Sequence, residues 1–228
     1  MKLNTVQGDC ERRSFGELGM AGRAANRRAE LREALIGIAE RRIAEHGYKA
    51  LTAREVANEA GCSVGSIYTL FKDMEALIAE VNSRTTARLE AAVSAALGGL
   101  EGDISPKRHL VALGQTYFEF VAANPRLWSA IFEAGGHADG AVAEARKAEH
   151  AQLLGHVVRP LTALLPDMPA PQVELVARSL FAAVHGIVSL GQQRQFMPVP
   201  STEVAAQIAF IVEAFADGVS RTAASRSG

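Results

Sequence analysis

The sequence lacks the features of most disulfide-rich, metal-binding and membrane proteins. Its two cysteines, Cys10 and Cys62, form no CxxC or Cys/His cluster, so neither a disulfide framework nor a zinc site is expected. The first residues contain no apolar run typical of a secretory signal, and the most apolar internal stretch, residues 179–191, is shorter than the roughly 18 residues of a membrane span. We therefore expect a soluble, cytoplasmic protein with no membrane partner.

Several common catalytic and cofactor-binding motifs are also absent. The chain contains no HExxH, P-loop or GxGxxG pattern. His150 and His156 do not have the i,i+4 spacing of a helical metal pair. The glycine-rich residues 135–140 (GGHADG) predict a loop, with metal binding as a remote alternative. We expect no enzyme, no cofactor and no metal site.

An excess of charge is missing from the chain as a whole, because 24 lysines and arginines balance 25 aspartates and glutamates. The distribution is nevertheless uneven. Residues 12–54 hold ten basic and five acidic side chains, a local charge of +5, whereas residues 91–228 hold ten basic and twelve acidic ones. A basic segment is typical of nucleic-acid binding, although a solvated helix face gives the same count.

Alternation of β-branched and polar residues, the pattern of a half-buried strand, is absent too. Apolar residues recur instead at three- and four-residue spacing, which predicts an all-α protein. Residues 1–26 have no sustained period and predict a mobile basic tail. The predicted helices span residues 27–46, 52–61, 64–71, 73–97, 106–123, 125–134, 140–165, 171–196 and 202–222, with Pro or Gly at most of their ends.

Two short predicted helices joined by a tight turn form the clearest motif. Thr52 and Glu55 have the spacing of a capping box, which starts a helix that Gly61 can end. Ser63 is a good N-cap for the next helix. The pattern therefore predicts a helix-turn-helix, a motif that places its second helix in the major groove of DNA.

The second helix of this motif carries small side chains that suit the major groove. Ser66 and Thr69 can hydrogen-bond to base edges, Val64 can contact a thymine methyl group, and Gly65 allows the backbone to approach closely. Other residues nearby are assigned to phosphates, which fix the register on DNA. The candidate phosphate-binding residues are Thr52, Arg54, Tyr68 and Lys72, Tyr68 having core packing as its alternative role, and Ser63 completes the DNA-binding set.

Residues 47–77 (GYKALTAREVANEAGCSVGSIYTLFKDMEAL) resemble the DNA-binding region of TetR-type transcriptional repressors. The resemblance is carried by the aromatic after Gly47, by Thr52, Val56, Ala57, the turn at 60–63, Tyr68, Phe71 and the ending Glu75-x-Leu77. It implies a repressor that binds double-stranded DNA at a palindromic operator. One departure is Met74, which stands where the family usually has a phosphate-binding lysine, and Lys72 is the candidate to replace it.

The rest of the chain resembles the regulatory domain of the same family, in particular the subgroup named for a Trp-His-Gly (WHG) motif. The resemblance rests on residues 117–128 (YFEFVAANPRLW) and 181–186 (FAAVHG), in which Phe181 replaces the tryptophan of the motif. It implies a small-molecule effector in a helical cavity and a homodimer formed through the last two long helices. The candidate ligand-binding residues are Tyr117, Val121, Trp128, Phe132, Phe181, His185 and Gln192, with core packing, or a structural hydrogen bond for His185, as the alternative role.

These patterns predict three parts: the tail at residues 1–26, a DNA-binding domain at residues 27–75, and an effector-binding and dimerisation domain at residues 76–228. The predicted function is that of a homodimeric repressor released from its operator by a small molecule. An activator or effector-independent regulator on the same fold, and a helical ligand carrier or enzyme, are the alternatives.

Overall fold

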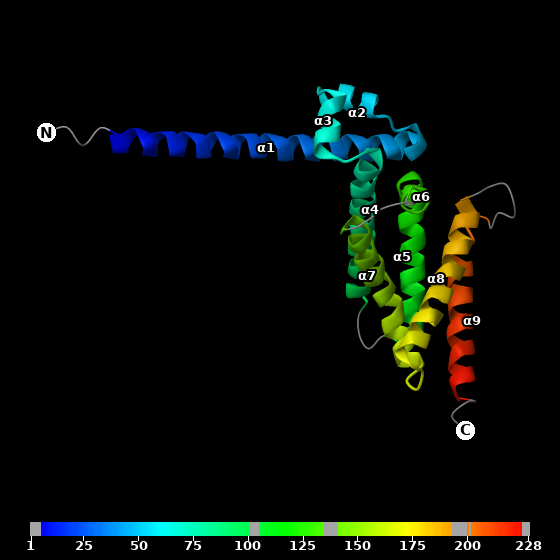
Figure 1. Cartoon of the computed structure of the whole chain (residues 1–228). Coiled ribbons are helices and arrows are strands. Elements are labelled where there is room, and N and C mark those ends of the chain that lie inside the picture. The colour runs from blue at the N-terminus through cyan, green and yellow to red at the C-terminus, as the bar shows by residue number, and fades with distance from the viewer. Residues whose placement is uncertain (1–5, 101–104, 135–140, 193–199, 201, 225–228) are drawn as a thin grey trace. The chain divides into compact units, whose positions relative to one another are not determined.

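The computed structural model describes the backbone of residues 6–100, 105–134, 141–192, 200 and 202–224. Within these ranges the chain forms α-helices, one short 3-10 helix and no strand, so the all-α prediction is confirmed (Figure 1). The predicted loop at 135–140 and the predicted helix end at Phe196 lie outside the described residues. The elements are α1 (Val6–His46), η1 (Tyr48–Ala50), α2 (Ala53–Ala60), α3 (Val64–Leu70), α4 (Met74–Gly98), α5 (Pro106–Ala123), α6 (Pro125–Glu133), α7 (Ala141–Leu164), α8 (Ala170–Gln192) and α9 (Val204–Ala224).

The chain divides into two compact units, residues 1–81 (the first unit) and residues 82–228 (the second unit), and α4 runs through the boundary. In the first unit, α1, α2 and α3 pack against one another. Residues three and four apart lie on one face of a helix, so α1 presents a single apolar stripe to this core. The buried side chains are Leu35, Ile36, Ile38, Ala39 and Ile43 of α1, Val56 and Ala57 of α2, Ile67 of α3, and Phe71, Leu77 and Val81 after it.

α1 begins at Val6 rather than near Arg27, so the predicted tail falls within this helix from Val6 onward. The prediction relied on an apolar period, which residues 1–26 lack. The side chains of residues 22–30 are all exposed. Residues 20–33 are rich in Ala, Arg and Glu, which have high helix propensity, and contain no proline, so the helix continues N-terminally.

The second unit is a helical bundle around α5, which packs against α6, α7, α8 and α9. α8 also packs against α7 and α9 (Figure 1). The side-chain amide of Asn82 donates a hydrogen bond of 3.1 Å to the carbonyl of Ala130, which ties α4 to α6. The common core includes Leu89 and Val93 of α4, Leu110, Leu113 and Val121 of α5, Leu161 of α7, Val184 and Val188 of α8, and Ile208 and Val212 of α9.

α8 is long and apolar enough to cross a membrane by length and composition, over Ala170–Gly191. The sequence pattern placed its most apolar part at residues 179–191 alone. Length and composition are weak evidence, because the core helix of a globular protein passes the same test. One face of α8 does belong to the core, through Val173, Ala177, Leu180, Val184 and Val188.

A close approach of α5 and α9 at Gly114 gives a test of this packing. A Cβ atom at Gly114 would lie 2.6 Å from Cγ2 of Ile208, which is fully buried and has little room to move. We expect Gly114→Ala to lower the free energy of unfolding by about 1–3 kcal/mol, as overpacking does. Urea unfolding followed by circular dichroism measures the change.

Gly155→Ala is the matched control, because a Cβ atom at Gly155, inside α7, meets nothing within 4 Å. This variant should leave the free energy of unfolding unchanged or raise it by up to about 1 kcal/mol, since alanine is the better helix former. Equal destabilisation of the two variants would contradict the close approach of α5 and α9.

Candidate nucleic-acid interface and candidate ligand cavity

A capping box and a left-handed glycine define the ends of α2. The Thr52 hydroxyl accepts a hydrogen bond from the N–H of Glu55 (3.3 Å) and donates one to the Glu55 carboxylate (2.8 Å). Gly61 has a φ of 65°, a left-handed conformation that favours glycine, and its N–H points back to the last turn of α2. With α3 following at once, the predicted helix-turn-helix is confirmed.

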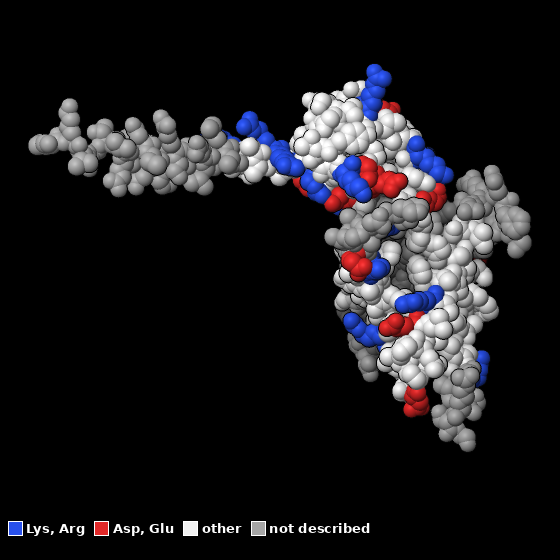
Figure 2. Space-filling model, viewed as in Figure 1, with Lys and Arg blue, Asp and Glu red and all other residues white. Residues whose placement is uncertain are grey.

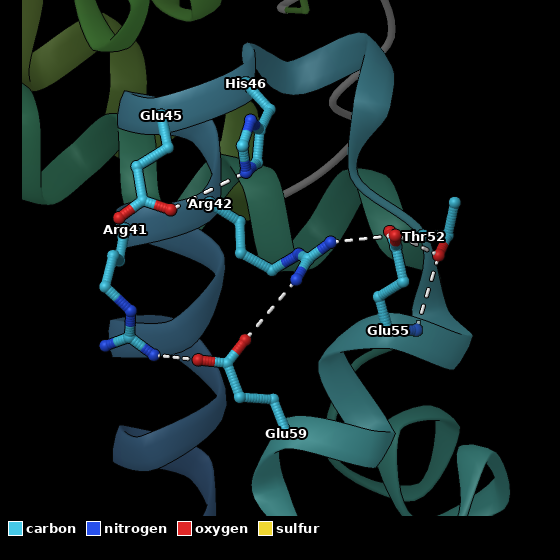
Figure 3. Close-up of polar contacts among 7 residues, drawn as sticks. All are labelled: Arg41, Arg42, Glu45, His46, Thr52, Glu55 and Glu59. Atoms are coloured by element: carbon cyan, nitrogen blue, oxygen red, sulfur yellow. Dashed lines mark hydrogen bonds and ion pairs between the residues drawn. The ribbon is translucent and has the colours of Figure 1, made fainter.

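Ion pairs connect α2 to α1 (Figure 3). The Arg42 guanidinium lies 2.9 Å from the Glu55 carboxylate, and Arg41 pairs with Glu59. The Thr52 hydroxyl and then the charge of Arg42 hold the pKa of Glu55 below its ordinary value, against an opposing effect of burial. The sequence pattern did not reveal these pairs, because their partners lie on separate helices.

α3 is a short helix whose buried side chain is Ile67. Ser63 caps it, because its hydroxyl accepts a hydrogen bond of 3.1 Å from the N–H of Ser66, and the two serine hydroxyls lie 2.9 Å apart. The Thr69 hydroxyl donates to the Gly65 carbonyl (2.9 Å). These bonds hold the three side chains in place on α3.

The predicted DNA-binding residues are accessible, all being exposed except Ser66, which is half-buried. Tyr68 is 51% exposed and Val64 is 38% exposed, so core packing is not the role of Tyr68. Among the described residues, no ion pair engages Arg54 or Lys72. Figure 2 shows basic side chains over the first unit, with acidic side chains beside some of them.

Arg28 reaches α3 from α1, although the sequence pattern gave it no individual role. Its guanidinium donates a hydrogen bond of 3.1 Å to the carbonyl of Thr69, near the C-terminal end of α3. A cation is favourable there, because the last carbonyls of a helix carry a partial negative charge. Arg28 therefore helps to orient α3 against α1.

The second unit contains a cavity of about 270 Å³ with an almost entirely apolar lining. Tyr117, Trp128, Phe132 and Phe181, four of the predicted ligand-binding residues, line it. Two of the others do not, because Val121 is fully buried in the core and His185 lies outside the described lining. The side chain of Gln192 lies outside the described part of the structure, so its role stays a prediction.

A hydrogen-bonded chain of three rings stands beside this cavity. The Trp128 Nε1–H donates to the Tyr117 hydroxyl (2.8 Å), and that hydroxyl can donate its own proton to Nδ1 of His185, 2.9 Å away. Burial raises the pKa of Tyr117 and lowers the pKa of His185, so both rings are neutral at pH 7. His185 therefore has the structural hydrogen bond that was its alternative role.

A polar contact also ties two walls of the cavity. Nε2 of His156 on α7 lies 2.7 Å from the carboxylate of Glu90 on α4. Each residue is next in sequence to a lining residue, Val157 and Leu89 respectively. This pair joins helices that are far apart in sequence, so the spacing of residues did not predict it.

Two family models match the chain. Residues 35–81 match the model described as "Bacterial regulatory proteins, tetR family", and residues 110–215 match the model described as "Tetracyclin repressor-like, C-terminal domain". The chain belongs to the tetR family. It is therefore a DNA-binding transcriptional regulator and not an enzyme. The WHG subgroup stays a prediction.

Solved structures share this fold over most of the chain. A protein of unknown function from Rhodococcus sp. RHA1 is 27% identical, with 82% of this chain and 94% of that chain covered and a TM-score of 0.66. A TetR-family transcriptional regulator from Bordetella parapertussis 12822 is 19% identical (81% and 93% covered, TM-score 0.59). The regulator FadR from Bacillus subtilis, in complex with stearoyl-CoA, is 16% identical (82% and 98%, TM-score 0.60). No curated protein matches the chain.

Replacing Thr52 by valine tests the capping box. Thr52→Val keeps the shape of the side chain but removes both hydrogen bonds to Glu55, so the free energy of unfolding at pH 7 should fall by about 1 kcal/mol. The pKa of Glu55 is lowered in the folded state, so its ionised carboxylate stabilises the fold at pH values above its ordinary pKa of 4.5. This stabilisation is lost as the pH falls through the lowered pKa and the carboxylate takes up a proton. The difference between wild type and variant should therefore shrink below pH 4.5.

Thr162→Val serves as the control for this measurement. Thr162 is an exposed threonine within α7 whose hydroxyl donates to the Val158 carbonyl (3.0 Å) and caps no helix. Its replacement should change the free energy of unfolding by less than about 0.5 kcal/mol at either pH. A Thr52→Val effect that is the same at pH 7 and pH 3 would show that the carboxylate of Glu55 takes no part.

Proposed function

We propose that the chain is a homodimeric repressor that binds a palindromic DNA operator through α3 and leaves it when a small molecule enters the cavity of the second unit. The observation that carries the proposal is the exposed face of α3. Its capped end and accessible Val64 and Tyr68 suit a helix that enters the major groove with its first residues. Because a regulator of bacterial genes must reach DNA, we place the protein in the cytoplasm.

The assignment of individual roles follows from position and chemistry. Ser66, Thr69, Val64 and Gly65 meet base edges, while Ser63 orients the first turn of α3 by capping it. Lys72 and Arg54 bind phosphates, and Tyr68 adds a phosphate contact from α3. Thr52 takes part only if its hydroxyl exchanges the bond to Glu55 for one to DNA, because its proton is already donated to that carboxylate.

Dimerisation is supported by the needs of the DNA site and by the surface of the last two helices. One short helix covers few base pairs, so useful specificity calls for two copies of α3 in half-sites about 34–36 Å apart or a multiple of that distance. Large apolar side chains are exposed on α8 and α9, and Leu175 and Phe210 are each 64% exposed. A second copy of the chain would bury them in a four-helix interface.

The effector role is supported by the apolar cavity, which resembles small-molecule sites in its concave shape and aromatic lining. FadR from Bacillus subtilis, which has the same fold, was solved with stearoyl-CoA bound. A ligand that binds better to the conformation unable to hold DNA shifts the population away from the operator.

Lys72→Ala tests the DNA interface and the replacement of the missing lysine at Met74. The probe is a DNA site that the full-length protein selects from a randomised pool, which we expect to contain an inverted repeat. Loss of one phosphate contact per chain should weaken binding and reduce the slope of log affinity against log salt by about 0.9 per contact, or about 1.8 per dimer. Fluorescence anisotropy over a range of salt concentrations measures this slope.

Lys147→Ala is the control, because Lys147 is 72% exposed and lies in the second unit. Its slope should equal that of the wild type. If the pool yields no enriched sequence, the proposed function is wrong. If the two lysine variants have the same slope, Lys72 has no contact with the DNA backbone.

A further inference from the structure

The charges around the cavity restrict the chemistry of its ligand. Among the described residues that line it there is no aspartate or glutamate, and Arg178 is the one lysine or arginine. His150, on α7, is exposed and is the other lining side chain that can carry a positive charge. A cationic ligand would therefore find no counter-charge in the described lining, whereas an anionic ligand would find one.

The polar atoms in the wall offer little to a polar ligand body. The Trp128 N–H is already donated to Tyr117, and the Tyr117 hydroxyl already lies at hydrogen-bond distance from His185. Thr86 contributes one hydroxyl, and most of the remaining lining is apolar: Leu89, Val93, Leu110, Leu153, Leu154, Val157. A buried hydroxyl or amide of a ligand that does not reach Thr86 would lose its water without gaining a partner, which is unfavourable.

Arg178 is positioned to hold a head group at the edge of the cavity. Its side chain is 66% exposed, so the guanidinium remains in contact with solvent while the residue lines the cavity. Glu174, one turn earlier on α8, lies 3.6 Å from it and neutralises part of its charge. An exposed carboxylate at this point would compete with Glu174 for the guanidinium.

Building on the effector role proposed above, we propose that this cavity binds an amphiphile with a hydrocarbon body and a single carboxylate. The hydrocarbon occupies the apolar interior, and the carboxylate lies at Arg178. The volume of about 270 Å³ lies near the lower limit of small-molecule sites, so a body of modest length fits.

Three probes with the same ten-carbon chain test whether the cavity prefers a negative, a neutral or a positive head group. They are decanoate, decanol and decyltrimethylammonium, each used below its micelle-forming concentration. Trp128 lines the cavity and is the single tryptophan of the chain, so its fluorescence reports binding directly. Full-length protein should bind decanoate about fivefold more tightly than decanol, the size expected of a solvent-exposed ion pair, and decyltrimethylammonium more weakly than decanol.

Two variants on α8 should shift the affinity in opposite directions. Arg178→Gln should reduce the affinity for decanoate about fivefold, to the level of decanol, and leave decanol unchanged. Glu174→Gln removes the competing carboxylate and should tighten decanoate binding about twofold. Arg108→Gln, at an exposed arginine of α5 outside the lining, is the matched control and should change neither. General damage to the fold cannot produce the gain expected for Glu174→Gln.

The proposal is overturned if the cationic probe binds as tightly as decanoate, if Arg178→Gln and Arg108→Gln behave alike, or if none of the probes gives a saturable change. Adding decanoate to the complex with the selected DNA site tests the effector role separately. Saturable decanoate binding without release of DNA would support the ligand class and contradict the effector role. Failure of the protein to select any DNA site would contradict the repressor function while leaving the ligand measurements intact.

Discussion

The burial of one side chain, Ile67, determines whether the recognition helix exists. A seven-residue helix is too short to be stable alone, so α3 depends on packing against α1 and α2. Ile67 is fully buried, and Val56 of α2 and Ile36 of α1 are fully buried in the same unit. Because Ile67 is the buried residue of α3, Val64 and Tyr68 remain at the surface, and Ser63 and Thr69 are exposed as well. The same packing therefore stabilises the helix and leaves its outer face exposed.

The helix ends of the helix-turn-helix could be predicted from the sequence, because capping depends on residues that are neighbours in the chain. Thr52, Gly61 and Ser63 each act within four residues, and the structure shows each at the expected helix end. The start of α1 at Val6 was not predicted, because residues 1–26 have no apolar period that would indicate a helix. The contact of Arg28 with Thr69 and the pair of Arg41 with Glu59 join separate helices, so no spacing in the sequence encodes them.

The residues that line the cavity of the second unit were predicted only in part, because their positions also depend on contacts between separate helices. Periodicity places Tyr117 and Val121 on one face of α5, yet Tyr117 lines the cavity while Val121 packs into the core. What separates them is the position of the neighbouring helices, which depends on close contacts such as that between Gly114 and Ile208. Under the proposed function, α4 links the two activities along the chain, since Leu77 belongs to the core of the first unit and Leu89 lines the cavity.

The central claim is that two copies of α3 enter the major groove of one operator. Methylation interference at guanine N7, a major-groove atom, measures this directly with full-length protein on the selected DNA site. We expect two symmetric patches of interference whose centres lie about 10 base pairs, or a multiple of this helical repeat, apart. A single patch, or binding that is insensitive to methylation of the major groove throughout the site, would contradict it.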